Sequence, residues 1–154
     1  SRGLGDVYKR QSKITVVLTA EASGIALATI CAQKYGVPML FAKKAKSDNI
    51  ESGLYQSEVF SYTYKKRVTL LVSQEWLNAD DHVLIIDDFM ANGFAVQGLV
   101  DIVNEAGAKL EGIGIAVEKG FQGGGDRFRA SGIPYKALAV IEKADENGFV
   151  FREE

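Results

Sequence analysis

The stretch HVLIIDDFMANGFAVQG, residues 82–98, carries the strongest fold signal in the chain. It opens with an apolar run at residues 83–86, which is typical of a strand buried on both faces of a sheet. Two adjacent acids, Asp87 and Asp88, follow that run directly. Because neighbouring negative charges repel each other, their position at a strand end indicates a ligand that binds both.

A short loop and an amphipathic helix come next. Valine and leucine residues between 96 and 103 repeat at i, i+3, i+4 and i+7, so the loop at residues 90–95 opens a helix. Backbone N–H groups at a helix N-terminus attract a phosphate dianion, and Gly93 lets the backbone approach it closely. A sugar phosphate would satisfy both features, since its hydroxyls donate to the acids while its phosphate lies in the loop.

Strand and helix patterns alternate along most of the chain, which predicts an α/β fold with a parallel sheet flanked by helices. A polar segment at residues 43–66 interrupts the alternation. The β-rich stretches SEVFSYTY (57–64) and RVTLLVS (67–73) predict an antiparallel β-hairpin there that projects from the sheet. Asn147 and Gly148 predict a turn into a short terminal strand. Ser23 is a candidate N-cap for the first helix. Strands are expected at residues 14–18, 39–42, 83–86, 113–117 and 137–141, and helices at 24–35, before Gly107, and after 123.

Composition describes an ordinary soluble globular protein of one domain. The chain has 154 residues, of which 47% are hydrophobic and 25% charged, and its net charge is −2. No apolar run reaches the ~18 residues that a membrane helix needs, and the mild acidity disfavours a nucleic-acid-binding role. The single Cys31 excludes a disulfide framework, so we expect a reducing, cytoplasmic setting.

Residues 1–11, SRGLGDVYKRQ, are treated separately. They show no clear periodicity, and they can be back-translated into a common sequencing adapter. We expect them to be a non-native leader that replaces the true N-terminus, with the functional domain at residues 12–154.

Other reactive or large side chains have simpler interpretations. Cys31 lies in a helix of small residues and is expected to be a buried hydrophobe rather than a nucleophile. His82 precedes a strand and is expected at the surface, while Trp76 is expected to pack in the interior. No cluster has the spacing of a zinc site, so no metal site built by the protein alone is expected.

The motif VLIIDDFMANGFA, residues 83–95, resembles the phosphoribosyl pyrophosphate signature of the type I phosphoribosyltransferases. Many members have threonine where this chain has Ala95, which puts one hydroxyl contact to the 5′-phosphate in doubt but not the backbone cradle. Within the family the chain is most similar to the bacterial branch that salvages xanthine. The segments that carry this likeness are ASGIALA (22–28), GVPMLFAKK (36–44), AGAKLEGIGIAVEKGFQ (106–122) and FVFREE (149–154).

The resemblance assigns roles to individual residues. It implies that Asp87 and Asp88 are catalytic residues that hold the ribose hydroxyls. From the residues alone, the other positions have rival interpretations: an ordinary capped helix at 21–24, and solvated surface lysines elsewhere. The implied sets are Ala91, Asn92, Gly93, Phe94 and Ala95 for the 5′-phosphate; Glu21, Ala22, Ser23, Gly24, Lys43 and Lys44 for pyrophosphate; and Lys119 for the purine.

The implied reaction joins xanthine to phosphoribosyl pyrophosphate and releases xanthosine 5′-monophosphate and pyrophosphate. Mg²⁺ would enter with the substrate, because a hard ion suits phosphate oxygens and water. The likeness also implies a homodimer, while the mild acidity and the lack of a long apolar run predict no nucleic-acid or membrane partner. The lysine-bearing hairpin at residues 46–66 is hypothesised to be a lid that excludes water during the reaction. The family's N-terminal hood over the base would be missing from this chain, which blurs base specificity.

Two other functions remain open at this stage. One is a phosphoribosyltransferase for adenine or for guanine and hypoxanthine. The other is a non-catalytic regulator of purine synthesis that senses phosphoribosyl pyrophosphate with this same domain.

Overall fold

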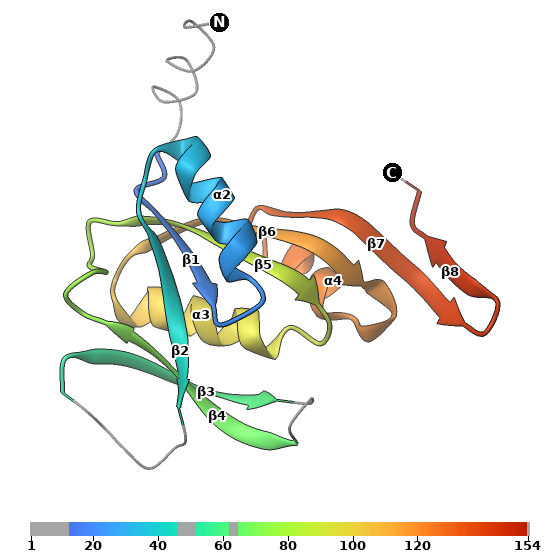
Figure 1. Ribbon diagram of the computed structural model, residues 1–154, viewed down its shortest axis with the longest axis horizontal. Helices are drawn as coiled ribbons and strands as arrows, with labels where there is room; N and C mark the ends of the chain where they lie inside the picture. The colour runs from blue at the N-terminus through green and yellow to red at the C-terminus, as the bar shows by residue number, and fades with distance from the viewer. Residues whose placement is uncertain (1–12, 46–51, 62–64, 154) are drawn as a thin grey trace, which may run out of the picture.

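The computed structural model describes residues 13–45, 52–61 and 65–153. In this part of the chain, eight strands form one sheet in the order β3-β4-β2-β1-β5-β6-β7-β8 (Figure 1). The predicted leader, residues 1–11, lies outside the described residues. The strands are β1 (Val16–Ala20), β2 (Met39–Ala45), β3 (Leu54–Ser61), β4 (Lys66–Ser73), β5 (His82–Met90), β6 (Lys109–Lys119), β7 (Tyr135–Asp145) and β8 (Gly148–Phe151); the helices are α2 (Ile25–Tyr35), α3 (Phe94–Glu105), α4 (Gly124–Ala130) and the 3₁₀ turn η1 (Gly120–Gln122).

The centre of the sheet is parallel. β1 pairs with β2 on one side and β5 on the other, so that Leu18 lies opposite both Leu40 and Ile85. β5 continues to β6, and β6 to β7, with the same strand direction. The predicted α/β fold with a parallel sheet is therefore confirmed, and the carboxyl ends of its central strands share one edge.

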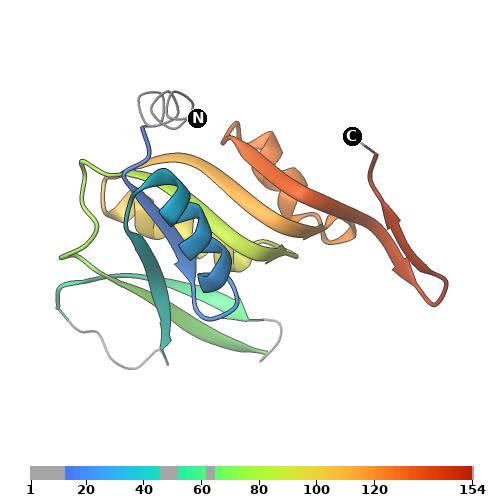
Figure 2. The ribbon, with the colours of Figure 1, turned by 45° about the horizontal axis from the view of Figure 1, so that its top comes forward.

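Helices α2 and α3 cover opposite faces of this sheet (Figure 2). Because successive strand residues point to opposite faces, Val17 packs with Ala28 and Ala32 of α2, whereas Leu18 belongs to the cluster that α3 completes. Phe128 of α4 joins that second, larger cluster. The main core thus lies between the sheet and α3.

The hairpin of β3 and β4 is antiparallel, as predicted. β4 also pairs antiparallel with β2, so the hairpin continues the sheet at its edge. Val59 and Leu70 are buried, and both contact the face of α3 at Gly98. Of the predicted lid, residues 46–51 and 62–64 lie outside the described part of the chain.

Several local predictions differ from the structure. β5 runs on to Met90, so Asp87 and Asp88 lie inside the strand rather than after it. Gly24, not Ser23, is the N-cap of α2, and no side-chain cap bond forms there. Trp76 is exposed rather than packed, since no described core cluster includes it.

The remaining side chains follow their predictions only in part. His82 is half-buried rather than fully at the surface, and its Nδ1 lies 2.6 Å from Oε1 of Glu111 on the neighbouring strand. Cys31 is partly buried against the α2 cluster, and that burial raises the pKa of its thiol, with a smaller opposing effect from Lys34. The turn at Asn147 and Gly148 is present and leads into β8.

Candidate active site

The sequence-predicted site residues gather at the carboxyl ends of four parallel strands. Asp87 and Asp88 lie in β5, and the loop at residues 91–93 follows them into α3. Residues 21–24 connect β1, the strand that neighbours β5, to α2. Parallel sheets collect ligands at such an edge. Of the other predicted residues, Lys43 and Lys44 lie near the end of β2, and Lys119 ends β6.

The two acids lie in different environments. Asp87 is 8% exposed, whereas Asp88 is only partly buried. Oδ1 of Asp87 accepts a hydrogen bond from the Asp88 backbone N–H at 2.9 Å. Burial is the main cause that raises the pKa of Asp87 to about 7, and a side-chain hydrogen bond with Asp88 adds to it. Near neutral pH, the protonated and the ionised forms of Asp87 are therefore both populated.

The loop at residues 21–24 passes directly over Asp87. A Cβ atom on Gly24 would lie 2.7 Å from Oδ1 of Asp87 and 2.2 Å from Oγ1 of Thr19, so no side chain fits there. The Thr19 hydroxyl is fully buried and has no hydrogen-bond partner among the described residues. The peptide bond between Glu21 and Ala22 is cis. Thr19 was missed by the sequence analysis, because a threonine inside an apolar strand carries no motif.

Glu21 joins this loop to β2. Its Oε1 accepts a hydrogen bond from the Lys44 backbone N–H at 2.6 Å, and its own N–H donates to the Ala42 carbonyl oxygen at 3.1 Å. The positive charge of Lys44 lowers the pKa of Asp87, but burial outweighs this effect. The charge of Lys44 therefore acts on Asp87 across the neighbouring strand β1.

The loop that follows β5 has the geometry of an anion cradle. Gly93 has φ of 87°, in the left-handed region that favours glycine, and it is the N-cap of α3. The Asn92 Oδ1 accepts the Phe94 N–H at 3.2 Å, and the Ala91 carbonyl accepts the Gly124 N–H at 3.1 Å. Asn92 thus occupies the Phe94 N–H, while the next N–H groups of the first helical turn, those of Ala95 and Val96, have no partner within the helix and point the way a phosphate would approach.

A cation that the sequence analysis missed lies beside this loop. Nη2 of Arg127 is 3.0 Å from the position of a Cβ on Gly93, and its guanidinium is 5.9 Å from the Phe94 ring centre. Arg127 comes from α4, which lies far along the chain from the loop. Only the tertiary fold brings this positive charge next to the cradle.

Lys119 lies beside exposed aromatic surface. Its Nζ is 5.6 Å from the centre of the Phe89 ring, on the adjacent strand. Phe89 and Phe121 are 52% and 53% exposed. A flat apolar ring with polar edges could lie against such side chains while the ammonium donates to one of its oxygens.

The comparisons with known proteins identify the family. The sequence model of the phosphoribosyl transferase domain matches residues 4–143. The chain belongs to the phosphoribosyltransferase family. The resemblance drawn from the motif at residues 83–95 is therefore confirmed, and the chain is an enzyme of the pentosyltransferase class. Members of this family bind phosphoribosyl pyrophosphate and a base.

Two relatives of this phosphoribosyltransferase are xanthine phosphoribosyltransferases. That of Bifidobacterium longum is 55% identical over 130 residues, which cover 84% of this chain and 67% of the relative. That of Ruminiclostridium cellulolyticum is 54% identical over 153 residues, or 97% of this chain and 80% of the relative. These relatives favour the enzyme over the regulator considered above.

Solved structures confirm the phosphoribosyltransferase fold. The adenine phosphoribosyltransferase of Giardia lamblia, complexed with 9-deazaadenine, has a TM-score of 0.74 at 23% identity and covers 92% of this chain and 77% of its own. That of Trypanosoma brucei, in complex with AMP, pyrophosphate and ribose-5-phosphate, has a TM-score of 0.71 at 24% identity and covers 90% and 63%. In the described residues, no helix is long and apolar enough to cross a membrane.

Proposed function

We propose that this phosphoribosyltransferase joins xanthine to phosphoribosyl pyrophosphate and releases xanthosine 5′-monophosphate and pyrophosphate. The choice of base is supported by the relatives at 54–55% identity, which are xanthine phosphoribosyltransferases. The site geometry supports the sugar substrate. The single observation that carries the proposal is the close approach of Gly24 to Asp87. It places a loop suited to pyrophosphate next to an acid suited to ribose.

The sugar would lie along β5 and its loop. Asp87 and Asp88 accept hydrogen bonds from the ribose hydroxyls, so both act as catalytic residues. The 5′-phosphate lies in the cradle at residues 91–95, where backbone N–H groups and the dipole of α3 stabilise its charge. Ala95 offers no hydroxyl here, so the backbone carries this contact. The positive charge of Arg127 adds to it.

The leaving group would lie over α2. Backbone N–H groups of Ala22, Ser23 and Gly24 face the diphosphate in this proposal, and Glu21 holds their loop against β2 through its bonds to Ala42 and Lys44. Lys43 and Lys44 neutralise the charge of the diphosphate. As the anomeric C–O bond breaks, its electron pair goes to pyrophosphate and the ribose gains oxocarbenium character. Stabilising the departing anion is then the main catalytic task, and no covalent nucleophile is required.

Mg²⁺ fits this arrangement as a group that arrives with the substrate. Among the described residues, no three histidine, cysteine or acidic side chains are grouped to hold a metal. The hard oxygens near it would be those of the diphosphate, the ribose hydroxyls and water, with Asp87 and Asp88 behind the hydroxyls. When bound, the ion supplies positive charge to the leaving pyrophosphate.

The base would lie against the exposed aromatic side chains of Phe89 and Phe121, with the ammonium of Lys119 at its edge. Lys119 donates to the purine O6, which fixes the orientation of the nitrogen that attacks the anomeric carbon. We also propose that residues 12–154 form the functional domain without residues 1–11, that the enzyme acts as a cytoplasmic homodimer, and that it needs neither nucleic acid nor membrane.

The test is pyrophosphate release from phosphoribosyl pyrophosphate and Mg²⁺ with xanthine, guanine, hypoxanthine and adenine in separate reactions. The expected result is the highest kcat/KM for xanthine. A higher value for another base would replace the base assignment and leave the reaction class intact. No release with any base, from folded protein, would contradict the proposed function. A variant without residues 1–11 should match the parent chain.

A further inference from the structure

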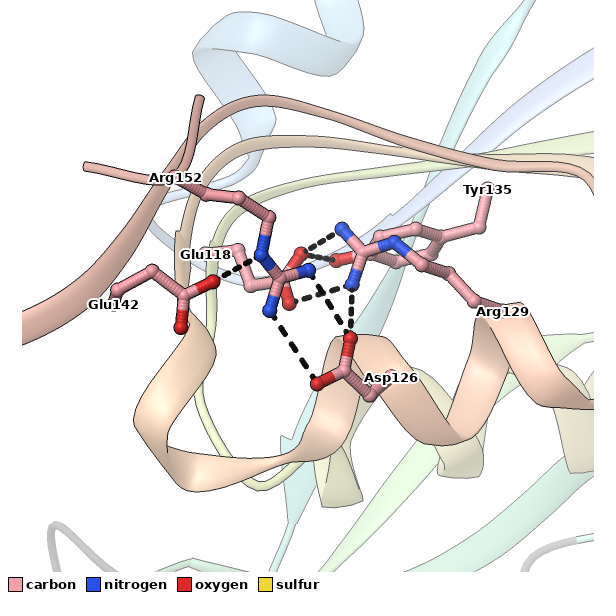
Figure 3. Close-up of polar contacts among 6 residues, drawn as sticks. All are labelled: Glu118, Asp126, Arg129, Tyr135, Glu142 and Arg152. Carbon is pink, nitrogen blue, oxygen red and sulfur yellow. Dashed lines mark hydrogen bonds and ion pairs between the residues drawn. The ribbon is translucent and has the colours of Figure 1, made fainter. Parts of the chain in front are cut away.

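A buried carboxylate lies next to the proposed base-binding lysine. Glu118 is 0% exposed, at the end of β6. Arg129 of α4 donates to both of its oxygens, with Nη1 to Oε1 at 2.8 Å and Nη2 to Oε2 at 2.5 Å. The Tyr135 hydroxyl donates to Oε2 at 3.0 Å (Figure 3). A buried charge persists only when it is paired in this way, so the geometry around Glu118 is well defined.

A second arginine extends the cluster to the last strand. Arg152, just after β8, donates through Nε to Glu142 and through Nη1 to Asp126 Oδ1 at 3.2 Å (Figure 3). Asp126 also accepts from Arg129 at 2.8 Å, so it joins the two arginines. The Arg152 backbone N–H donates to the Val140 carbonyl at 2.8 Å. The cluster therefore links β6, α4, β7 and the segment after β8.

This cluster holds the residues on both sides of Lys119. Glu118 precedes Lys119 and is fixed by Arg129. Gly120 follows it, and a Cβ on Gly120 would lie 3.5 Å from Nη2 of Arg152 and 2.9 Å from Cγ1 of Val140. Side chains alternate along a strand, so Glu118 points into the cluster while Lys119 points to the other face, toward Phe89. The cluster therefore fixes the backbone on both sides of Lys119, on the face of β6 opposite to the lysine side chain.

We propose that Glu118, Arg129, Asp126 and Arg152 are positioning residues that hold Lys119 and the turn at Gly120–Gln122 in place for the purine base. This inference rests on the proposed function, in which Lys119 contacts the base. Arg152 differs from the other three because it follows β8, so it connects that strand to the residues around Lys119. Loss of Arg152 should weaken use of the base while leaving the sugar phosphate site intact.

The test compares Arg152→Ala with Lys143→Ala. Lys143 forms an exposed ion pair with Asp145 at 2.7 Å in the same β7–β8 hairpin, and it lies beyond Ile141, the last β7 residue that pairs with β6 in the described structure. For Arg152→Ala we expect KM for xanthine to rise about tenfold, with the dissociation constant for Mg²⁺–phosphoribosyl pyrophosphate within about twofold of the parent. Lys143→Ala should change neither quantity. Arg152→Lys, which keeps the charge beside Asp126, should recover part of the loss.

Hydrogen exchange gives a readout that does not depend on activity. Backbone amides of residues 118–122 should exchange faster in Arg152→Ala, and those of residues 91–95 should not. Unchanged exchange at 118–122, or equal losses for both substrates, would overturn the inference while the parent enzyme remained active. If the parent transferred ribosyl phosphate to no purine, the proposed function would fail, and the inference with it.

Discussion

Asp87 illustrates how burial tunes a single side chain. Its ordinary pKa of 3.8 rises to about 7, chiefly because the folded protein removes its carboxylate from water, and Asp88 adds to the shift. An ionised carboxylate accepts hydrogen bonds from ribose hydroxyls and stabilises a cationic ribose, whereas the neutral acid does so less well. Protonation of this one residue is therefore expected to control binding of the sugar phosphate.

The first prediction concerns the pH dependence of substrate affinity. Because Asp87 ionises as pH rises through about 7, affinity for Mg²⁺–phosphoribosyl pyrophosphate should increase by up to about tenfold per pH unit below 7 and level off above it. Titration calorimetry from about pH 5.5 to 8.5 measures this. The substrate phosphates also titrate near pH 6, so the informative quantity is the ratio of parent to Asp87→Asn affinities. A ratio independent of pH would contradict the prediction.

The same pKa shift has the opposite effect on the stability of the free protein. A carboxyl with a raised folded-state pKa contributes stability that is fully present below about pH 4 and is lost as pH rises through about 7. Relative to Asp87→Asn, the free energy of unfolding of the parent should fall over this range by at most about 4 kcal/mol. Urea unfolding of both proteins checks this, and parallel pH profiles would argue against it.

Individual site residues could be predicted from the sequence only where the residues next to them formed a recognisable pattern. The adjacent acids and Gly93 were predicted because they follow an apolar run and precede a helix pattern, whereas the basic pair at 43 and 44 was predicted from the family resemblance. Thr19 and Glu118 were not found. The burial of Thr19, and the bonds of Glu118 to Arg129 and Tyr135, arise only in the folded chain. The one local hint was an acid directly before Lys119.

At the scale of secondary structure, α4 links two parts of the site. A Cβ on Gly124 would lie 2.5 Å from the Ala91 carbonyl oxygen, and a Cβ on Gly125 would lie 2.2 Å from Cδ of Glu118. The first turn of this helix therefore contacts both the phosphate cradle and the end of β6. These two glycines allow α4 to fix the spacing between the 5′-phosphate site and the base site.

A prediction about stability follows from that contact. Gly125→Ala should displace the buried Glu118 from Arg129 and lower the free energy of unfolding by about 2–3 kcal/mol, because the added methyl has no room. Gly112→Ala, in β6 itself, is the control. A Cβ on Gly112 would lie 3.3 Å from its nearest atom, the Pro134 carbonyl oxygen, so this substitution should cost much less. Urea unfolding compares the two. Equal losses would show that the contact with Glu118 is not the cause.

Element types were predicted better than element bounds. Gly36, with φ of 68°, ends α2 at its predicted position, since glycine adopts that conformation readily. The strands were predicted too short: β5 and β6 continue into charged residues, where hydropathy gives no strand signal. Pairing with neighbouring strands keeps those residues extended, and this depends on the whole sheet.

At the scale of the whole molecule, the sheet connects the proposed pyrophosphate site to the edge hairpin. Lys43 pairs with Leu71 and Lys44 with Leu70, so the backbone that carries the two lysines is hydrogen-bonded to β4. β4 in turn pairs with β3 (Figure 1). The sequence predicted the hairpin but not this neighbour, because strand order in a sheet is a long-range property. The other end of the sheet, at β7 and β8, has no such link to the lysines.

The last prediction uses this asymmetry between the two hairpins. Binding of Mg²⁺–phosphoribosyl pyrophosphate should order Lys43 and Lys44 around the diphosphate, and the ladder should pass that ordering to β4. Hydrogen exchange of residues 69–71 should then slow by about fivefold or more, since exchange reports local opening. Residues 148–151 of β8 serve as the internal control and should not change. If β4 exchange is unaffected at saturating ligand, the hairpin does not respond to the substrate, and its proposed role as a lid has to be abandoned.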